Sequence, residues 1–148
     1  MENIFAQKEG VDYEKTFPPI AKWATIQTLF SLAAQNSWKV HQMDVKTAFL
    51  NGDLKENVFM SWPEGFAVKG HQHKVCKLVK SLYGLKQASR AWYEKLTEHL
   101  LKLNFKHYDL DDETLFVKKV GKTIVYLVVY VDDLLMTGNN EEGIGEKF

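Results

Sequence analysis

The chain has 148 residues, of which 45% are hydrophobic and 13% aromatic, and this composition favours a folded domain with a core over a disordered segment. Its 19 Lys and Arg balance 19 Asp and Glu, so the overall charge neither indicates nor excludes a nucleic-acid partner. The single cysteine, Cys76, excludes an intrachain disulfide. The most apolar run, residues 123–131, is too short for a membrane-spanning helix, and no secretory signal opens the sequence. We therefore expect a soluble, intracellular protein with no disulfide or membrane partner.

The first half of the chain is predicted to contain one helix and two strands. Apolar residues recur at three- and four-residue spacing over residues 20–36, which indicates an amphipathic helix. The apolar stripe of this helix is predicted to consist of Trp23, Ile26, Phe30 and Ala33. Residues 38–45 and 57–62 have the composition of strands, and Asn51-Gly52 between them is a strong turn signal.

The second half is predicted to contain one helix and four further strands. The strands are predicted over residues 74–81, 114–119, 122–131 and 134–137. Ser89 is predicted to cap a helix that continues to Leu103, with Trp92, Leu96 and Leu100 on its apolar face. Two helices and several hairpin-linked strands predict an α+β fold, in which an antiparallel sheet packs on two main helices.

Charge is distributed unevenly along the chain. Residues 69–106 contain nine Lys or Arg and two Glu, a net charge of +7, whereas residues 1–68 and 107–148 carry net charges of −2 and −5. A basic surface of this kind could face phosphates, but solvated lysines on amphipathic elements explain the same pattern equally well. The acidic stretch from Asp109 to Glu113 is interpreted as a surface loop without a catalytic role.

The strongest candidate for a reactive site is a pair of adjacent carboxylates. Nine mostly β-branched or aromatic residues precede Asp132 and Asp133, and three apolar residues follow them. Such a pair is costly at the end of a core strand unless a cation binds there, although an exposed hairpin turn explains it equally well. Asp44 ends another predicted strand, so neighbouring strands would bring three carboxylates together. These oxygen ligands suit Mg²⁺, and two such ions serve in-line phosphoryl transfer.

Three segments together resemble the catalytic motifs of copia-type retrotransposon reverse transcriptases. The segments are DVKTAFLNGDL from Asp44, SLYGLKQASRAWY from Ser81 and YVDD from Tyr130. Their order and spacing match that family from about Phe5 to about Asn140. The resemblance implies a palm-like polymerase fold and RNA-directed DNA synthesis, with an RNA or DNA template, a primer and deoxynucleoside triphosphates as partners. It also implies two Mg²⁺ ions, with Mn²⁺ as a substitute.

The resemblance implies metal binding for three residues and nucleotide binding for four more. Asp44 and Asp132 would be the main metal ligands, and Asp133 a weaker one. The nucleotide contacts would come from Val45, Ala48, Phe49 and Gly84. The ring of Phe49 would lie beneath the incoming sugar and exclude a ribose 2′-hydroxyl, and the alternative for this residue is a plain core aromatic.

Four further residues would contact template and primer. Lys86 and Arg90 would face template phosphates, and their alternative is solvation at the start of a helix, more so for Arg90. Tyr130 and Val131 would touch the end of the primer.

The same resemblance predicts how the chain divides. Residues 1–18 would be a remnant of the fingers, residues 19–140 the palm and residues 141–148 a disordered tail. The match would then be truncated at both ends, without complete fingers, primer grip, thumb or RNase H. The alternatives to a polymerase are a non-catalytic nucleic-acid-binding remnant and an inactive transposon relic. By family analogy alone, the protein would work in a cytoplasmic particle or in the nucleus, for an element whose DNA copy integrates.

Overall fold

The computed structural model describes residues 7, 10, 13, 16–63, 65–66, 69–70, 74–108 and 111–140. The chain forms two compact units, and each unit is assembled from two separate segments. Unit 1 comprises Met1–Phe17 and Thr47–Lys95, and unit 2 comprises Pro18–Lys46 and Leu96–Phe148. The predicted division into fingers and palm stays a prediction, and the predicted tail at 141–148 lies outside the described residues. Among the described residues, no helix is both long and apolar enough to cross a membrane.

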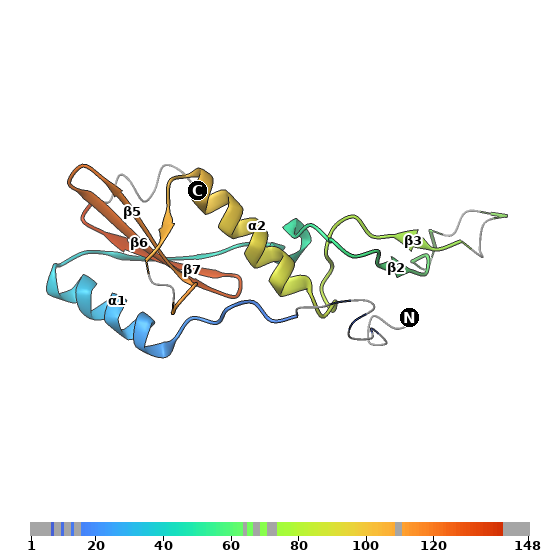
Figure 1. Ribbon diagram of the computed structural model, residues 1–148, viewed down its shortest axis with the longest axis horizontal. Helices are drawn as coiled ribbons and strands as arrows, with labels where there is room; N and C mark the ends of the chain where they lie inside the picture. The colour runs from blue at the N-terminus through green and yellow to red at the C-terminus, as the bar shows by residue number, and fades with distance from the viewer. Residues whose placement is uncertain are drawn as a thin grey trace. The chain divides into compact units, whose positions relative to one another are not determined.

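Unit 2 is built on a five-stranded antiparallel sheet with the strand order β1-β7-β6-β5-β4. Figure 1 labels β5, β6 and β7 of this sheet. The strands of the sheet are β1 (Val40–Asp44), β4 (Lys106–His107), β5 (Leu115–Val120), β6 (Thr123–Tyr130) and β7 (Asp133–Gly138). The four strands predicted in these regions are confirmed to within two residues at each end. Three of these strands, β5, β6 and β7, were readily predictable because they follow one another through tight turns and pair with their neighbours in sequence.

Helix α1 (Trp23–Gln35) packs on one face of this sheet. The core there joins Ala21, Ile26 and Leu29 to Val128 of β6. The predicted helix is confirmed, but its predicted stripe is wrong in part, because Trp23 is 71% exposed and Phe30 46% exposed. At about 100° per residue, Ile26, Leu29 and Ala33 lie along one line of the helix, and Trp23 and Phe30 lie well to one side of it.

The N-terminus of α1 is capped by a carboxylate from a distant part of unit 2. Asp112 is only 6% exposed, and it accepts hydrogen bonds from the hydroxyl groups of Thr25 and Thr114 and from the Thr114 N–H at 3.0 Å. Burial acts to raise the pKa of Asp112, but these hydrogen bonds, with one from the Lys22 N–H, hold it below its ordinary value. Lys22 is the N-cap residue of α1 and makes no side-chain cap of its own. The interpretation of this stretch as a surface loop is therefore wrong for Asp112.

The other face of the sheet presents the fully buried side chains of Phe116, Leu127 and Met136, which the register places in one row. Helix α2 (Ala88–Lys102) belongs to unit 2 from Leu96 onward, and its residues Leu96 and Leu100 are buried as predicted. In Figure 1, α1 runs along one side of the sheet, and the end of α2 that leads into β4 runs along the other side.

The start of α2 differs from the prediction in one respect. Ser89 is the second residue of the helix, so the prediction that it caps the helix is wrong. The preceding turn leads directly into the helix, because the Ala88 N–H already bonds to the Leu85 carbonyl at 3.1 Å.

Unit 1 contains the short 3-10 helix η2 (Ala48–Asn51), the two-stranded pair β2 (Phe59–Met60) and β3 (Cys76–Lys77), and the first part of α2. The strands predicted over 57–62 and 74–81 are thus confirmed in place but are only two residues long each. Their pairing continues irregularly, through a hydrogen bond from the Leu78 N–H to the Val58 carbonyl at 2.8 Å. The core of this unit consists of Val58, Leu85 and Ala88, with Phe49, Leu54, Leu78 and Leu82 packed against it.

Candidate active site

Asp44 and Asp133 lie directly opposite each other at one end of the unit 2 sheet. Asp44 is the last residue of β1 and Asp133 is the first residue of β7, and the antiparallel register pairs them. The register of the next strand pair places Tyr130, the last residue of β6, opposite Asp133. Because directly paired residues point to the same face of a sheet, the side chains of Asp44, Asp133 and Tyr130 form a row across its end.

The tight turn between β6 and β7 brings Asp132 to the same place. Val131 and Asp132 form this turn, and Val131 has a φ of 59°, a left-handed conformation that is strained for a β-branched residue. The Asp132 carbonyl accepts a hydrogen bond from the Val45 N–H at 3.0 Å. This bond extends the β1–β7 pairing beyond Asp44, so all three predicted aspartates and Val45 meet at one sheet end.

Gln42 is a neighbour of this site that the sequence analysis did not identify. Its Nε2 donates a hydrogen bond to Asp133 Oδ1 at 3.2 Å. Gln42 and Asp44 are two residues apart on β1 and therefore share a face of the sheet. This two-residue spacing could have identified Gln42 from the sequence. Asp44 is exposed, whereas Asp132 and Asp133 are half-buried, so the site opens to solvent at its β1 side.

The donors at this sheet end have the chemistry that a hard divalent cation requires, since carboxylate oxygens are the ligands that Mg²⁺ prefers. Within the described ranges, however, no three His, Cys, Asp or Glu side chains are gathered closely enough to hold a metal ion. Like-charged carboxylates repel one another when no cation neutralises them, which favours such a spread arrangement. The backbone thus brings the three aspartates to the same end of the sheet.

Three of the predicted nucleotide-contact residues lie in unit 1. Ala48 is fully buried at the start of η2, directly after Thr47, whose φ is 56°. The half-buried ring of Phe49 lies against the ring of Tyr83, with 4.7 Å between their centroids. Gly84 follows with a φ of 98°, a conformation that favours glycine. The structure therefore groups Phe49 with Tyr83, a neighbour that the sequence analysis did not assign.

The two predicted template contacts differ in their surroundings. Arg90 Nε donates a hydrogen bond to Glu94 Oε1 at 3.1 Å, and Glu94 also binds Lys55 Nζ at 2.6 Å. Partial burial acts to raise the pKa of Glu94, but the hydrogen bonds from Lys55 and Arg90 hold it below its ordinary value. Lys86 is exposed and makes no ion pair with any side chain that the structure describes. Phosphate binding by Arg90 would therefore compete with Glu94, whereas Lys86 has no such competitor among them.

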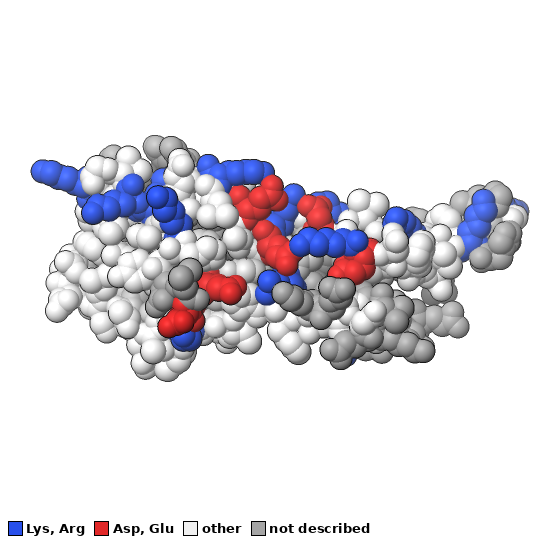
Figure 2. Space-filling model, viewed as in Figure 1, with Lys and Arg blue, Asp and Glu red and all other residues white. Residues whose placement is uncertain are grey.

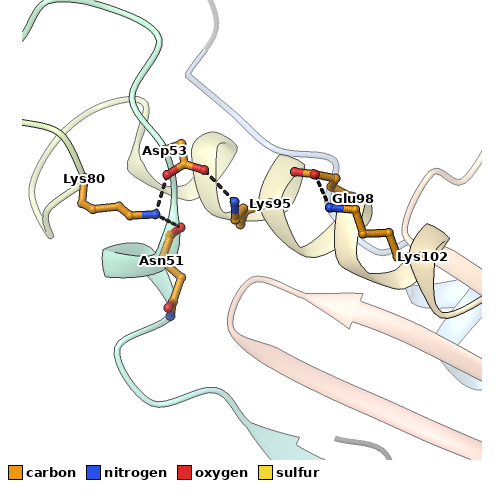
Figure 3. Close-up of polar contacts among 6 residues, drawn as sticks. All are labelled: Asn51, Asp53, Lys80, Lys95, Glu98 and Lys102. Atoms are coloured by element: carbon orange, nitrogen blue, oxygen red, sulfur yellow. Dashed lines mark hydrogen bonds and ion pairs between the residues drawn. The ribbon is translucent and has the colours of Figure 1, made fainter.

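A second charged cluster surrounds Asp53 in unit 1 (Figure 3). Lys80 and Lys95 each bind one oxygen of its carboxylate, with Lys95 Nζ at 2.7 Å. Lys80 Nζ also donates to the Asn51 carbonyl at 3.4 Å. The hydrogen bonds from Lys80 and Lys95 lower the pKa of Asp53 to about 2. The cluster ties the segment after η2 to the first part of α2.

Ion pairs also run along α2 itself. Arg90 pairs with Glu94 and, one turn further, Lys102 Nζ binds Glu98 Oε1 at 2.6 Å. On the face drawn in Figure 2, acidic and basic side chains accordingly interleave over α2. Four of the nine basic residues in 69–106 are thus engaged in local pairs, and this weakens the case from net charge for a continuous phosphate-binding surface.

The sequence matches a known family, with which the α+β architecture is compatible. The family model described as reverse transcriptase (RNA-dependent DNA polymerase) matches residues 2–147, so the chain belongs to this family. Among its relatives are copia-type Pol polyproteins of plant transposons, which confirms the resemblance drawn from the motifs.

Two of these relatives show how much of the chain is shared. The chain is 48% identical over 136 residues to the retrovirus-related Pol polyprotein from transposon RE1 of Arabidopsis thaliana, and 44% identical over 137 residues to that from transposon TNT 1-94 of Nicotiana tabacum. These matches cover 92% and 93% of this chain but only 9% and 10% of the two relatives. No solved structure matches the chain.

Proposed function

We propose that this chain provides the catalytic carboxylates of an RNA-directed DNA polymerase, on a palm-like fold that serves primer extension on an RNA or DNA template. The observation that carries the proposal is the direct pairing of Asp44 with Asp133, reinforced by the hydrogen bond from Val45 to Asp132. Membership of the reverse transcriptase family supports it.

In this proposal Asp44 and Asp132 are the main ligands of Mg²⁺, and Asp133 is a weaker one. Two bound Mg²⁺ ions would supply activation of the primer 3′-hydroxyl and neutralisation of charge on the triphosphate. Gln42 orients Asp133 by holding one of its oxygens. The strained turn at Val131 presents Tyr130 and the carboxylates from a fixed backbone, and positioning contributes much of the rate in such chemistry.

The remaining roles concern the substrates. In unit 1, Phe49 excludes the 2′-hydroxyl of a ribonucleotide, and Ala48 and Gly84 allow the backbone to approach the nucleotide. Lys86 binds template phosphate directly, and Arg90 does so by exchanging its partner Glu94. Val45 contributes through its backbone, and Tyr130 and Val131 contact the primer end.

Primer extension tests the proposal. With Mg²⁺ or Mn²⁺, the original chain should extend a primer on an RNA template, and Asp132→Asn should reduce the rate by more than about a hundredfold because a metal ligand is lost. Asp111→Asn, which changes an exposed aspartate outside the site, is the matched control. Equal extension by Asp132→Asn and the original chain would contradict the proposal.

The same assay separates the alternatives. Salt-dependent binding of a primer–template without extension, unaffected by Asp132→Asn, would favour a nucleic-acid-binding remnant that uses residues 69–106. Absence of both binding and extension would favour an inactive relic.

A stability measurement tests the carboxylate cluster without any polymerase activity. Without metal, Asp132→Asn should raise the melting temperature, because it removes one of three repelling charges. Mg²⁺ should then stabilise the original chain more than the variant. A lower melting temperature of the metal-free variant would count against clustering.

A further inference from the structure

The ring of Phe49 has two supports in unit 1. It packs against the buried cluster of Val58, Leu85 and Ala88. It also lies against the ring of Tyr83, with a centroid separation of 4.7 Å and an interplanar angle of 39°. Tyr83 is 50% exposed, which is unusual for an aromatic residue that serves only the core.

The backbone that carries Phe49 has little freedom to move. The Leu50 N–H bonds to the Thr47 carbonyl at 2.9 Å, and the Gly52 N–H bonds to the Phe49 carbonyl at 3.2 Å. A Cβ at Gly52 would lie 2.8 Å from the Trp92 backbone nitrogen, so the end of η2 rests directly on α2. The principal remaining motion of Phe49 is therefore rotation of its side chain.

Tyr83 is presented by a turn that is anchored to the same cluster. Leu82 packs on that cluster and Leu85 belongs to it, and the Leu85 N–H bonds to the Leu82 carbonyl at 3.2 Å. Gly84 allows the left-handed conformation in this turn. Both rings are thus fixed to one rigid base, and tilted aromatic pairs attract each other beyond the area that they bury.

We infer that Tyr83 is a positioning residue for sugar discrimination, because it holds the Phe49 ring in the place where that ring excludes a 2′-hydroxyl. The inference rests on the proposed function. A side chain that rejects a single oxygen atom must not move by the width of a hydroxyl group, and a half-buried phenylalanine that is supported by the cluster on one side alone can still rotate. The Tyr83 ring supplies the second support, and its hydroxyl is not required.

Nucleotide binding tests this inference independently of chemistry. The protein would be mixed with Mg²⁺ and a primer–template whose primer ends in a dideoxynucleotide, and the Kd values of dATP and ATP, which differ only at the 2′ position, would be compared. The variants are Tyr83→Leu, Tyr83→Phe and Phe49→Val, with Tyr108→Leu as a control that removes another exposed tyrosine from an aromatic pair.

Tyr83→Leu should lower the preference for dATP by about three- to tenfold, the range that one aromatic pair supplies, whereas Tyr83→Phe and Tyr108→Leu should keep it. If melting shows that Tyr83→Leu is unfolded, Tyr83→Met replaces it. A preference lost in Phe49→Val but kept in Tyr83→Leu would overturn the inference and leave the proposed function standing. Equal binding of dATP and ATP by the original chain would also overturn it. If neither nucleotide binds, both the inference and the proposed function fail for this chain.

Discussion

Asp112 caps helix α1 although 87 residues separate it from Thr25. Replacing it with Asn keeps the shape but turns one acceptor oxygen into an N–H₂ donor, which can no longer accept the hydrogen bonds made to that oxygen. We expect Asp112→Asn to lower the free energy of unfolding by about 1–2 kcal/mol, as lost caps do. Urea unfolding at neutral pH measures this, and an unchanged midpoint would show that the cap contributes nothing.

The lowered pKa of Asp112 also predicts a pH dependence. Because the folded pKa lies below the ordinary value of 3.8, the stabilisation is fully present above that value and is lost as the pH falls through the folded pKa. Asp112→Asn should therefore remove part of the acid sensitivity of stability below about pH 4. Parallel loss of stability with acid in both proteins would contradict the assignment.

The sequence did not reveal this role, because Asp112 lies in an acid-rich stretch that resembles solvated surface. One local signal was available: Asp112 and Thr114 are two residues apart, the spacing at which an Asp side chain bonds to its own backbone. The helix that completes the arrangement lies in a distant segment, and periodicity in one segment carries no information about such a partner.

At the scale of elements, the turn signal at Asn51-Gly52 marks a position that requires glycine, but the physical reason differs from the one that the signal implies. Asn51-Gly52 predicts a turn on the ground that glycine allows a left-handed backbone, yet Gly52 has a φ of −67° and follows the 3-10 helix η2. Glycine is needed there for space, since a Cβ would lie 2.9 Å from the Ala91 side chain as well as 2.8 Å from the Trp92 nitrogen. The contact with α2 is what the sequence could not show.

Gly52→Ala should therefore destabilise the protein by about 1–3 kcal/mol, because the backbone of α2 cannot yield easily. Gly121→Asn is the matched control, since Gly121 has a φ of 60° with open space around its Cβ position and Asn tolerates that conformation. Equal stabilities of the two variants in urea would contradict the close approach.

The cluster at Asp53 gives a second prediction for the elements around η2. Asp53 should titrate at about 2, and Lys80→Gln should move its pKa up toward 3.8, because the hydrogen bond from Lys80 is the largest cause of the shift. The stabilisation that ionised Asp53 provides is thus present above pH 3.8 and is lost as the pH falls toward about 2. Titration of the carboxyl carbon by NMR measures the pKa, with Lys102→Gln as the control because Lys102 pairs with Glu98 instead. A midpoint near 3.8 in the original chain would refute the pairing.

At the scale of the whole molecule, the elements of unit 2 were the most predictable. Strands β5, β6 and β7 pair with their neighbours in sequence, and α1 has a clear period. Trp23 and Phe30 were misplaced because apolar spacing shows that a stripe exists but not where its edges lie. In unit 1, β2 and β3 are short because their irregular pairing depends on tertiary contacts that alternation alone does not encode.

The candidate site was predictable in its residues but not in its geometry. Asp44, Asp132 and Asp133 follow from the motifs, whereas the register that sets Asp44 against Asp133 needed the sheet order β1-β7-β6. The contact of Tyr83 with Phe49 joins residues far apart in sequence, and the motif spacing did not predict it. The contact of Gln42 with Asp133 also depends on the strand register, although the two-residue spacing of Gln42 and Asp44 indicates a shared face.

Titration of isotope-labelled protein with paramagnetic Mn²⁺ tests most directly whether the three aspartates share a divalent cation. Mn²⁺ broadens the NMR signals of nearby amides, so those of Asp44, Val45 and residues 131–133 should broaden first. Asp44→Asn should require markedly more Mn²⁺ for the same effect. Broadening that begins elsewhere, for example around Asp53, or that is identical in Asp44→Asn, would contradict a shared cation site at this end of the sheet.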